Sequence, residues 1–520
     1  MKASLNRLGG PLTVLAFLAI AFAAAYPMQV NGFNQNAHYA LVRALDQGTP
    51  QIDRTRHEIG DLGSNDVSIH DGHVYSNKAP GLALATLPAF EVVEATGMRT
   101  TGDPTRVIWA LHLWSIVVPF LVLLLLLRDR VERIEPGLGT IVAITAGLGT
   151  LLLPFSTLFF AHVPTAVLGF AAFTVLWRER ERQPRLALVL AGGILAGLAV
   201  TTAYELVLLG VVLGLYSISR GDVIRRALSY AAGALLGVVP LGLYNLWAFG
   251  SLTHVSYENN QTGGPSDQLR GSIGFGISTP DLRVIHDLLF SVWGLLTLTP
   301  VLACGVAGGV LLLLRRRFRA EAAVCLGVVT VYFLWASSLG EGLSPFGGLG
   351  PPRYLVTMLP FATLGLAVAF RAFPVTTLAL AALSCFQMAV QTMTNPLAAY
   401  DGDWWARLRT KQFSQTAASI VGVTGWYTIT LLAVAVLVAG VAAALSVRHV
   451  RGPRWDMLAA AGALGLWVVI ALRAQNPAGD ALGRDYVVAL VALLGVFAFA
   501  AAYLLGELPP RARRVRAAPS

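Results

Sequence analysis

The chain has 520 residues, of which 55% are hydrophobic and 13% are charged, and ordinary soluble domains carry about 25% charged residues. Apolar stretches of about 20 residues recur along nearly its whole length, and each is long enough to cross a bilayer core of roughly 30 Å as a helix. Most of these stretches lack the polar face that a soluble helix needs. The composition excludes a soluble protein and predicts an all-α protein that crosses the membrane many times.

The net charge of +10 does not predict a nucleic-acid partner, because the arginines fall in short clusters between apolar stretches. Every second loop carries such a cluster, which is the pattern of cytoplasmic loops under the positive-inside rule. The clusters are interpreted as topology signals that place both termini in the cytoplasm. The three cysteines lie inside apolar stretches without metal-ligand spacing and are predicted to be buried small hydrophobes: Cys304, Cys325 and Cys385.

The first apolar stretch, at about 11–28, is predicted to be an uncleaved span, and residues 29–104 then form a long extracytoplasmic loop. The 285–314 stretch is expected to hold a short interfacial helix before its span. With the first span included, roughly fourteen spans result, both termini being cytoplasmic. The later spans are predicted near 106–127, 137–155, 158–177, 186–203, 205–219, 227–249, 285–314, 321–339, 354–370, 374–394, 422–447, 456–472 and 486–505.

The first loop contains two stretches with helical patterns. Apolar residues at helical spacing predict a short amphipathic helix over Tyr39–Leu45, lying on the membrane surface. Gly81–Val93 is more apolar but too short to span, so it is predicted to lie along the interface as well. The most polar part of the protein lies between these two helices.

This polar stretch offers carboxylates, histidines and a lysine, which together can supply a general base and cationic contacts to a phosphate. A solvated loop with scattered charges is the alternative, and composition does not separate the two. The carboxylates, histidines and lysine of the stretch are Asp53, Glu58, Asp61, Asp66, Asp71, His57, His70, His73 and Lys78.

Further candidates lie outside this loop. Arg353 opens a span directly after Gly-Leu-Gly-Pro-Pro and is either an interfacial anchor or a contact to an anionic ligand. His162 and Glu205 each lie at the predicted outer edge of an apolar span, where a functional and a structural role are both open. His254 and Tyr257 are expected to line the same external cavity.

Several short motifs resemble those of the GT-C membrane glycosyltransferases, the superfamily that contains the protein O-mannosyltransferases and the lipid A aminoarabinose transferase. The central motif is Tyr75-Ser-Asn-Lys-Ala-Pro-Gly81, which is similar to the family's Tyr-x-x-Lys-Pro-Pro-like motif before its second interfacial helix. The resemblance covers roughly residues 1–370. It is also carried, in the same order and on the same predicted side, by Asn34–Leu45, Tyr244–Gly250, Leu288–Leu295 and Gly350–Leu355.

The resemblance implies roles for individual residues. Lys78 and Tyr75 match the motif residues that contact the carrier phosphate, and Arg353 is similar to an arginine that opens a later helix. His38 stands where the aminoarabinose transferase has an arginine. His73 belongs to a Gly-His-x-Tyr-Ser segment that related sequences share, and is a further donor-binding candidate.

The catalytic base that the resemblance implies is open among three carboxylates. Many members carry an Asp or Asp-Glu pair where this chain has Gln35-Asn36, so that carboxylate is missing. Related sequences carry a Gly-Asp shortly before the Gly-His-x-Tyr-Ser segment. Asp66 fits that spacing without a gap, Asp61 fits the Gly-Asp context with an insertion, and Asp53 is the third candidate.

Taken together, the resemblance implies an inverting, family 39-like transfer of a sugar from a polyprenyl-phosphate carrier to an envelope glycan, lipid or protein on the extracytoplasmic face of the cell membrane. Residues 1–370 are expected to form the catalytic core, and 371–520 further helices with a basic cytoplasmic tail. The Asp and His content of the loop is compatible with a divalent metal, but no ligand spacing supports one. The alternatives are a transporter or lipid flippase, and an inactive GT-C scaffold that only binds glycolipid.

Overall fold

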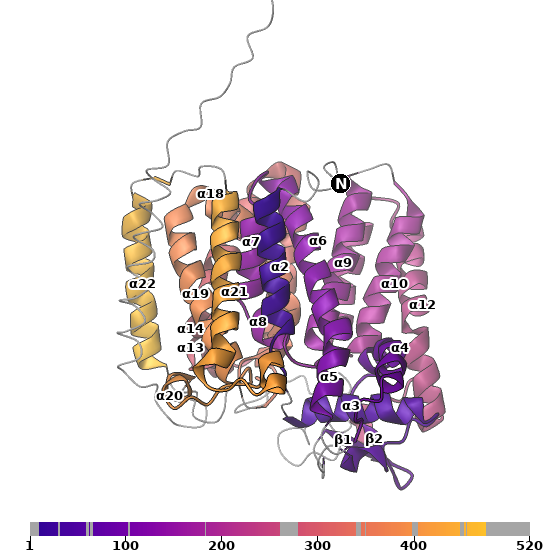
Figure 1. Cartoon of the computed structure of the whole chain (residues 1–520). Helices are drawn as coiled ribbons and strands as arrows, with labels where there is room; N and C mark the ends of the chain where they lie inside the picture. The colour runs from indigo at the N-terminus through magenta and orange to yellow at the C-terminus, as the bar shows by residue number, and fades with distance from the viewer. Residues whose placement is uncertain are drawn as a thin grey trace, which may run out of the picture.

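The computed structural model describes residues 10–29, 32–58, 62, 66–101, 104–181, 184–259, 279–339, 345–348, 350–397, 404–447, 452–453 and 455–474. These residues form a bundle of helices that run side by side, with the polar loop region gathered at one end (Figure 1). The first half of the bundle consists of α2 Pro11–Ala25, α5 Thr105–His112, α6 Val118–Ile134, α7 Gly139–Leu148, α8 Leu152–Phe155, α9 His162–Arg180, α10 Leu186–Thr202, α11 Leu206–Ile218 and α12 Val223–Phe249.

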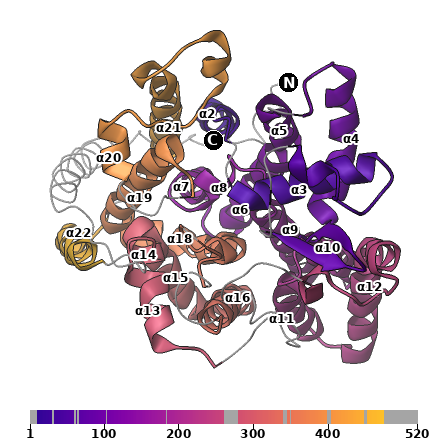
Figure 2. The same cartoon turned by 90° about the horizontal axis from the view of Figure 1, so that it is seen from below.

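The second half of the chain completes the bundle, and α2 packs against α21 although they lie at opposite ends of the described sequence (Figures 1 and 2). Its helices are α13 Leu282–Phe290, α14 Leu295–Leu298, α15 Val301–Leu313, α16 Arg319–Ser337, α17 Leu359–Leu364, α18 Leu366–Ala372, α19 Pro374–Thr394, α20 Trp404–Arg409, α21 Trp426–Ser446 and α22 Trp455–Arg473.

The predicted all-helical, multi-pass architecture is confirmed. Within the described ranges, 6 helices are long and apolar enough to cross a membrane, or up to 8 if each of two bent pairs counts as one span. The 285–314 stretch is one of these pairs, with a 92° bend between Leu282–Leu298 and Val301–Leu313, as expected of a short helix before a span. The predicted span over 137–155 is divided into α7 and the short α8, and the predicted span at 486–505 lies outside the described residues.

The long first loop forms two helices, α3 Gly32–Asp46 and α4 Gly81–Ala95, with a β-hairpin between them. Both helices lie where the sequence predicts them, but α3 is not a surface helix. It is buried on nearly all sides, because Ala37, Ala40 and Ala44 pack against the hairpin region while its other face packs on the bundle. Figure 2 shows α3 lying across the end of the bundle.

Glycines bring α10 and α12 into direct backbone contact. A Cβ at Gly237 would lie 2.3 Å from the carbonyl oxygen of Ile194 and 2.8 Å from the Cα of Gly197. Small residues allow such approach between membrane helices, where packing rather than hydrophobic burial drives association.

We expect Gly237→Ala to lower the free energy of unfolding by ~1–3 kcal/mol, because the added methyl group forces the two helices apart. Gly210→Ala is the control, since a Cβ at Gly210 meets nothing within 4 Å. Thermal unfolding in detergent measures both variants. Equal melting temperatures for the two would contradict the close packing of α10 on α12.

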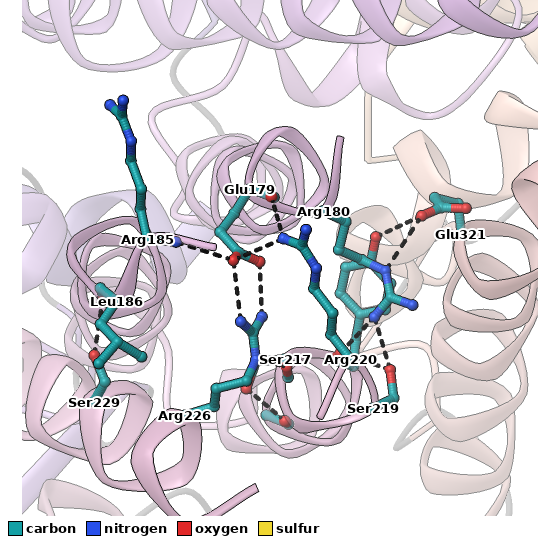
Figure 3. A network of polar contacts seen from close by, with 12 residues as sticks. Glu179, Arg180, Arg185, Leu186, Ser217, Ser219, Arg220, Arg226, Ser229 and Glu321 are labelled. Carbon is teal, nitrogen blue, oxygen red and sulfur yellow. Dashed lines mark hydrogen bonds and ion pairs between the residues drawn. The ribbon is translucent and has the colours of Figure 1, made fainter. Parts of the chain in front are cut away.

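At the end of the bundle away from the loop, arginines of the predicted topology clusters join neighbouring helices (Figure 3). Glu179 is fully buried, and both its carboxylate oxygens accept hydrogen bonds from Arg226, at 3.0 and 2.7 Å. Arg220 donates a third bond at 2.9 Å. A buried carboxylate is tolerated when it is paired in this way, so these arginines also fix the end of α9 against the start of α12.

The predicted burial of the cysteines holds for Cys304 and Cys325, whereas Cys385 is partly exposed.

Candidate functional site

A β-hairpin brings Asp66 and Lys78 together. β1 Val67–His70 pairs antiparallel with β2 His73–Ser76, so Val67 lies opposite Ser76 at the open end. Asp66 directly precedes β1. Lys78 follows β2, with one residue, Asn77, between the strand and the lysine. Asp71 and Gly72 form the turn with φ of 49° and 79°, the positive values of a type I′ turn. An Asp-Gly pair between strands of alternating polarity is a hairpin signal, and the sequence reasoning missed it.

The hairpin is fixed to the bundle through Ser256. Its hydroxyl donates to the carbonyl of Asn77 at 2.9 Å and lies 3.0 Å from the Tyr204 hydroxyl, and the Ser68 hydroxyl donates to its carbonyl. Ser256 itself is fully buried. The residues next to Lys78 are therefore held against the α10–α11 connection.

Asp66 and Lys78 form a largely buried ion pair with 2.7 Å between Oδ1 and Nζ, their side chains being 20% and 8% exposed. Burial acts to raise the pKa of Asp66, but the charges of Lys78 and Arg353 and hydrogen bonds from Lys78 and Asn77 hold it below its ordinary value. For Lys78, burial lowers the pKa, and the negative charge of Asp66 acts in the opposite direction. Asp66 adopts a left-handed φ of 54°, a conformation that Asp tolerates better than most non-glycine residues.

Lys78 forms part of the wall of a pocket with an empty volume of about 430 Å³. The wall comes from parts of the chain that are distant in sequence: α3, the start of α9, the α10–α11 connection, the segment after α12 and the segment before α17. Its polar side chains are Asn34, His38, Lys78, His162, Thr202, Tyr204, Glu205, Tyr257, Arg353 and Tyr354.

Some polar atoms of this pocket are buried and have no hydrogen-bond partner among the residues that the structure describes: Nδ1 of His38, Oδ1 of Asn34 and Nε of Arg353. No carboxylate described in the structure lies within ion-pair distance of Arg353, whose guanidinium instead lies near the rings of Phe160 and Tyr354. Buried polar groups are normally paired. These atoms are therefore arranged to meet a polar ligand.

His38 is held in its neutral form. Burial lowers its pKa to about 3, with the charge of Lys78 adding to the effect. The imidazole of His38 therefore offers a hydrogen bond rather than a positive charge at neutral pH.

This pKa predicts acid sensitivity. Below pH 6.5 the unfolded chain binds a proton at this histidine that the folded chain does not bind, so stability is lost as the pH falls toward 3. The loss between pH 6.5 and 5 amounts to at most ~2 kcal/mol for one group. We expect His38→Gln to reduce the fall in melting temperature between pH 7 and 5. The exposed His286 serves as control through His286→Gln, and an unchanged acid response in His38→Gln would refute the assignment.

Gln35 of α3 has a structural role. It is fully buried. Its Nε2 donates to the carbonyl of Gln29 at 3.0 Å, and its Oε1 accepts from the backbone of Phe159 at 3.3 Å. Both ends of the amide are used to fix α3 to the bundle.

Of the sequence-predicted site residues, the structure brings Lys78, Arg353, His38 and Tyr257 to the pocket wall and places Asp66 directly behind Lys78. It also brings His162 and Glu205 there. Asn34, Tyr204 and Tyr354 were not singled out from the sequence, since nothing in their local pattern distinguishes them.

Other predicted residues lie elsewhere. Asp53 and His73 form a pair at 3.2 Å on the outer side of the hairpin, with side chains 38% and 52% exposed. Tyr75 and His254 pack with His70 around the ring of Phe249. None of these four candidates lines the pocket. Asp61 lies outside the described residues.

In the part of the chain that the structure describes, no group of three or more His, Cys, Asp or Glu side chains is placed to hold a metal ion.

These features define a multi-pass helical membrane protein with a charged, partly unpaired pocket at one end of its bundle. No family model and no curated protein matches the sequence. Among solved structures, the chain is similar to ArnT from Cupriavidus metallidurans bound to undecaprenyl phosphate, with 15% identity, a TM-score of 0.49, and coverage of 95% of this chain and 77% of that one.

It is also similar to the oligosaccharyltransferase of Archaeoglobus fulgidus in the apo form, with 12% identity, a TM-score of 0.43, and coverage of 82% of this chain and 56% of that one. A structure of the same organism's oligosaccharyltransferase AglB with an inhibitory peptide and dolichol-phosphate gives 11% identity and a TM-score of 0.41. The likeness concerns the arrangement of helices, and the activity proposed below is derived from the pocket.

Proposed function

We propose that this protein is a GT-C-type, family 39-like glycosyltransferase that moves a sugar from a polyprenyl-phosphate carrier to an acceptor hydroxyl at the end of the bundle that holds the first loop. The observation that carries the proposal is the convergence of Lys78 and Arg353 on one pocket at the end of an apolar bundle. A lipid-linked phosphate needs this combination, because its anionic head must meet fixed cations while its chain stays in an apolar environment.

Lys78 and Arg353 are assigned to the carrier phosphate. Lys78 is fixed by Asp66, whereas Nε of Arg353 is buried without a partner. Asn34 and neutral His38 add polar contacts to the same anion or to its sugar. Preorganised cations of this kind stabilise the charge that develops on a departing phosphate.

Asp66 is assigned as the base. Its Oδ1 accepts from Lys78 and Asn77, and among the described residues no hydrogen bond reaches its Oδ2, which is left to take a proton. As the acceptor oxygen attacks the anomeric carbon, its proton passes to Asp66, the bond from that carbon to the phosphate oxygen breaks, and the carrier leaves as its monophosphate. A single displacement of this kind inverts the anomeric centre.

The carrier chain is assigned to the helix that begins beside the pocket. α11 follows Glu205 directly, and its exposed residues Val207, Val211 and Leu215 form an apolar stripe that leads away from the pocket. Their spacing of four residues places them on one face of the helix. The phosphate head of the carrier at Lys78 and its prenyl chain along α11 then occupy neighbouring parts of the protein.

The proposal also assigns which side of the membrane the pocket faces and which part of the chain forms the catalytic core. The arginine-rich end opposite the pocket is assigned to the cytoplasm, so the pocket faces the outside of the cell membrane and the acceptor is an envelope glycan, lipid or protein. Residues 1–370 supply every assigned pocket residue, and residues 371–520 are assigned to helices outside this catalytic core.

The test uses the purified full-length protein with polyprenyl phosphate, polyprenol and a panel of polyprenyl-phosphate sugars. We expect binding of polyprenyl phosphate but not of polyprenol, and release of the carrier phosphate with one of the sugars when envelope extract is present. Comparing envelope glycans with and without the protein then identifies the sugar and the acceptor together.

Three outcomes would overturn the proposal. Equal binding of polyprenol and polyprenyl phosphate would remove the phosphate assignment. Binding without transfer from any donor would leave a glycolipid-binding scaffold. Energy-dependent substrate movement in proteoliposomes without a glycosidic product would favour a transporter or flippase.

A further inference from the structure

A second pocket lies at the opposite end of the bundle, where α6 and α9 end and α16 begins. Its empty volume is about 910 Å³. Arg133 comes from α6, Arg180 from α9, and Arg316 and Arg317 from the turn before α16. Trp177 and Phe318, which are nearly fully buried, form its apolar base. The site proposed for sugar transfer uses none of these residues.

The carboxylates of this second pocket are already engaged. Glu321 accepts a hydrogen bond from the Tyr216 hydroxyl at 2.7 Å and lies 3.8 Å from Arg180 (Figure 3). Glu181 lies 3.6 Å from Arg130, and Arg130 does not line the pocket. Each acidic group at the wall is therefore neutralised by a neighbour.

Three of the four arginines at the wall have no such partner. Arg133, Arg316 and Arg317 are exposed, and no carboxylate that the structure describes lies within ion-pair distance of them. A topology signal needs arginines only somewhere in a cytoplasmic loop. Here two separate segments, α6 and the turn before α16, place these three arginines on one concave surface, which that rule does not require.

The start of α16 adds a second feature that favours an anion. A 3₁₀ turn, Arg316–Phe318, runs directly into α16, so the first N–H groups of the continuous helix are those of Arg316 and Arg317, which line the pocket. The first N–H groups of a helix lack partners within the helix and carry a partial positive charge. Together with nearby arginines, a helix of 19 residues offers an anion both backbone donors and side-chain charges.

We propose that this second pocket binds a phosphate group, held by Arg316, Arg317 and Arg133 at the start of α16. Arginine suits this ligand because its planar guanidinium donates two parallel hydrogen bonds to phosphate oxygens. Acidic membrane phospholipid and soluble phosphate share this chemistry, and the apolar base of Trp177 and Phe318 fits the glycerol end of a lipid. The proposal is independent of sugar transfer at the other end.

The test measures binding to the full-length protein in detergent by native mass spectrometry and ligand-dependent thermal shift. The probes are phosphatidylglycerol, zwitterionic phosphatidylcholine and inorganic phosphate. We expect Arg316→Gln/Arg317→Gln to weaken binding of the anionic probe by about tenfold or more, the effect of losing one charge-assisted contact. Pocket-dependent binding of phosphatidylglycerol alone identifies a lipid site, and pocket-dependent binding of inorganic phosphate identifies a soluble anion.

A matched control separates the pocket from general surface charge. Arg225 and Arg371 are exposed, lie outside the pocket, and removing both changes the net charge equally. Arg225→Gln/Arg371→Gln should keep wild-type affinity, and Arg133→Gln, on another helix, should weaken binding again without altering the unliganded melting temperature. Equal losses in the pocket and control variants, or unchanged affinity in both pocket variants, would overturn the proposal.

Discussion

Lys78→Met is expected to lower sugar transfer by about a thousandfold, the scale of removing one preorganised group that stabilises developing charge. Among the described residues, Lys78 is the only lysine at the pocket wall. Its Nζ is fixed 2.7 Å from Asp66, so no reorganisation is needed when charge develops on the departing phosphate. The measurement is the turnover of carrier phosphate, together with the affinity for polyprenyl phosphate.

The same substitution leaves the Asp66 carboxylate largely buried and unpaired, which itself destabilises the protein. The double variant Lys78→Met/Asp66→Asn removes both charges and is expected to recover thermal stability but not activity. Lys78→Arg keeps the charge and should retain part of the affinity. Recovery of transfer in the double variant would show that Lys78 serves only to pair Asp66.

Asp66→Asn is expected to lower turnover by about 10²–10⁴-fold, the range for removing a general base. Glu205→Gln is the matched control, because Glu205 lines the same pocket and the substitution likewise replaces a carboxyl group with an amide. We expect Glu205→Gln to lower turnover by tenfold or less. Since the charge of Lys78 helps to hold the pKa of Asp66 below its ordinary value, Asp66 stays ionised from pH 8 down to 5, and its titration should not reduce the rate in this range.

Which variant, Asp66→Asn or Glu205→Gln, loses more turnover identifies the catalytic base. A larger loss in Glu205→Gln than in Asp66→Asn would assign the base to Glu205 and leave Asp66 as the group that positions Lys78. A wild-type rate in both variants would place the chemistry on another carboxylate, for which Asp61 and Asp53 are the remaining candidates from the sequence.

The parts of this molecule that local sequence predicts well are its helices and the position of Lys78. Long apolar stretches have few alternatives to a helix in a membrane, because every backbone polar group must be paired within the segment. The helices α3 and α4 were found because their periodicity is local. The hairpin between them was missed, although Asp71-Gly72 between alternating residues predicts it.

The assignment of candidates to the pocket was only partly predictable. Asp53, His73, Tyr75 and Lys78 all lie within one polar stretch, yet Lys78 alone lines the pocket. The contacts that separate them are tertiary, because Asp53 pairs with His73, Tyr75 packs on Phe249, and Lys78 meets segments distant in sequence.

The sequence by itself determined that this is a multi-pass helical membrane protein, that its first loop begins and ends in helices, and that this loop contains the lysine proposed for phosphate binding. Only the tertiary structure decided that Arg353, Glu205 and His38 meet that lysine, and that the carboxylate beside it is Asp66. Apolar periodicity depends only on neighbouring residues, so it can be recognised in the local sequence. The pocket arises from contacts between segments separated by tens to hundreds of residues, and such contacts are set by how the helices pack.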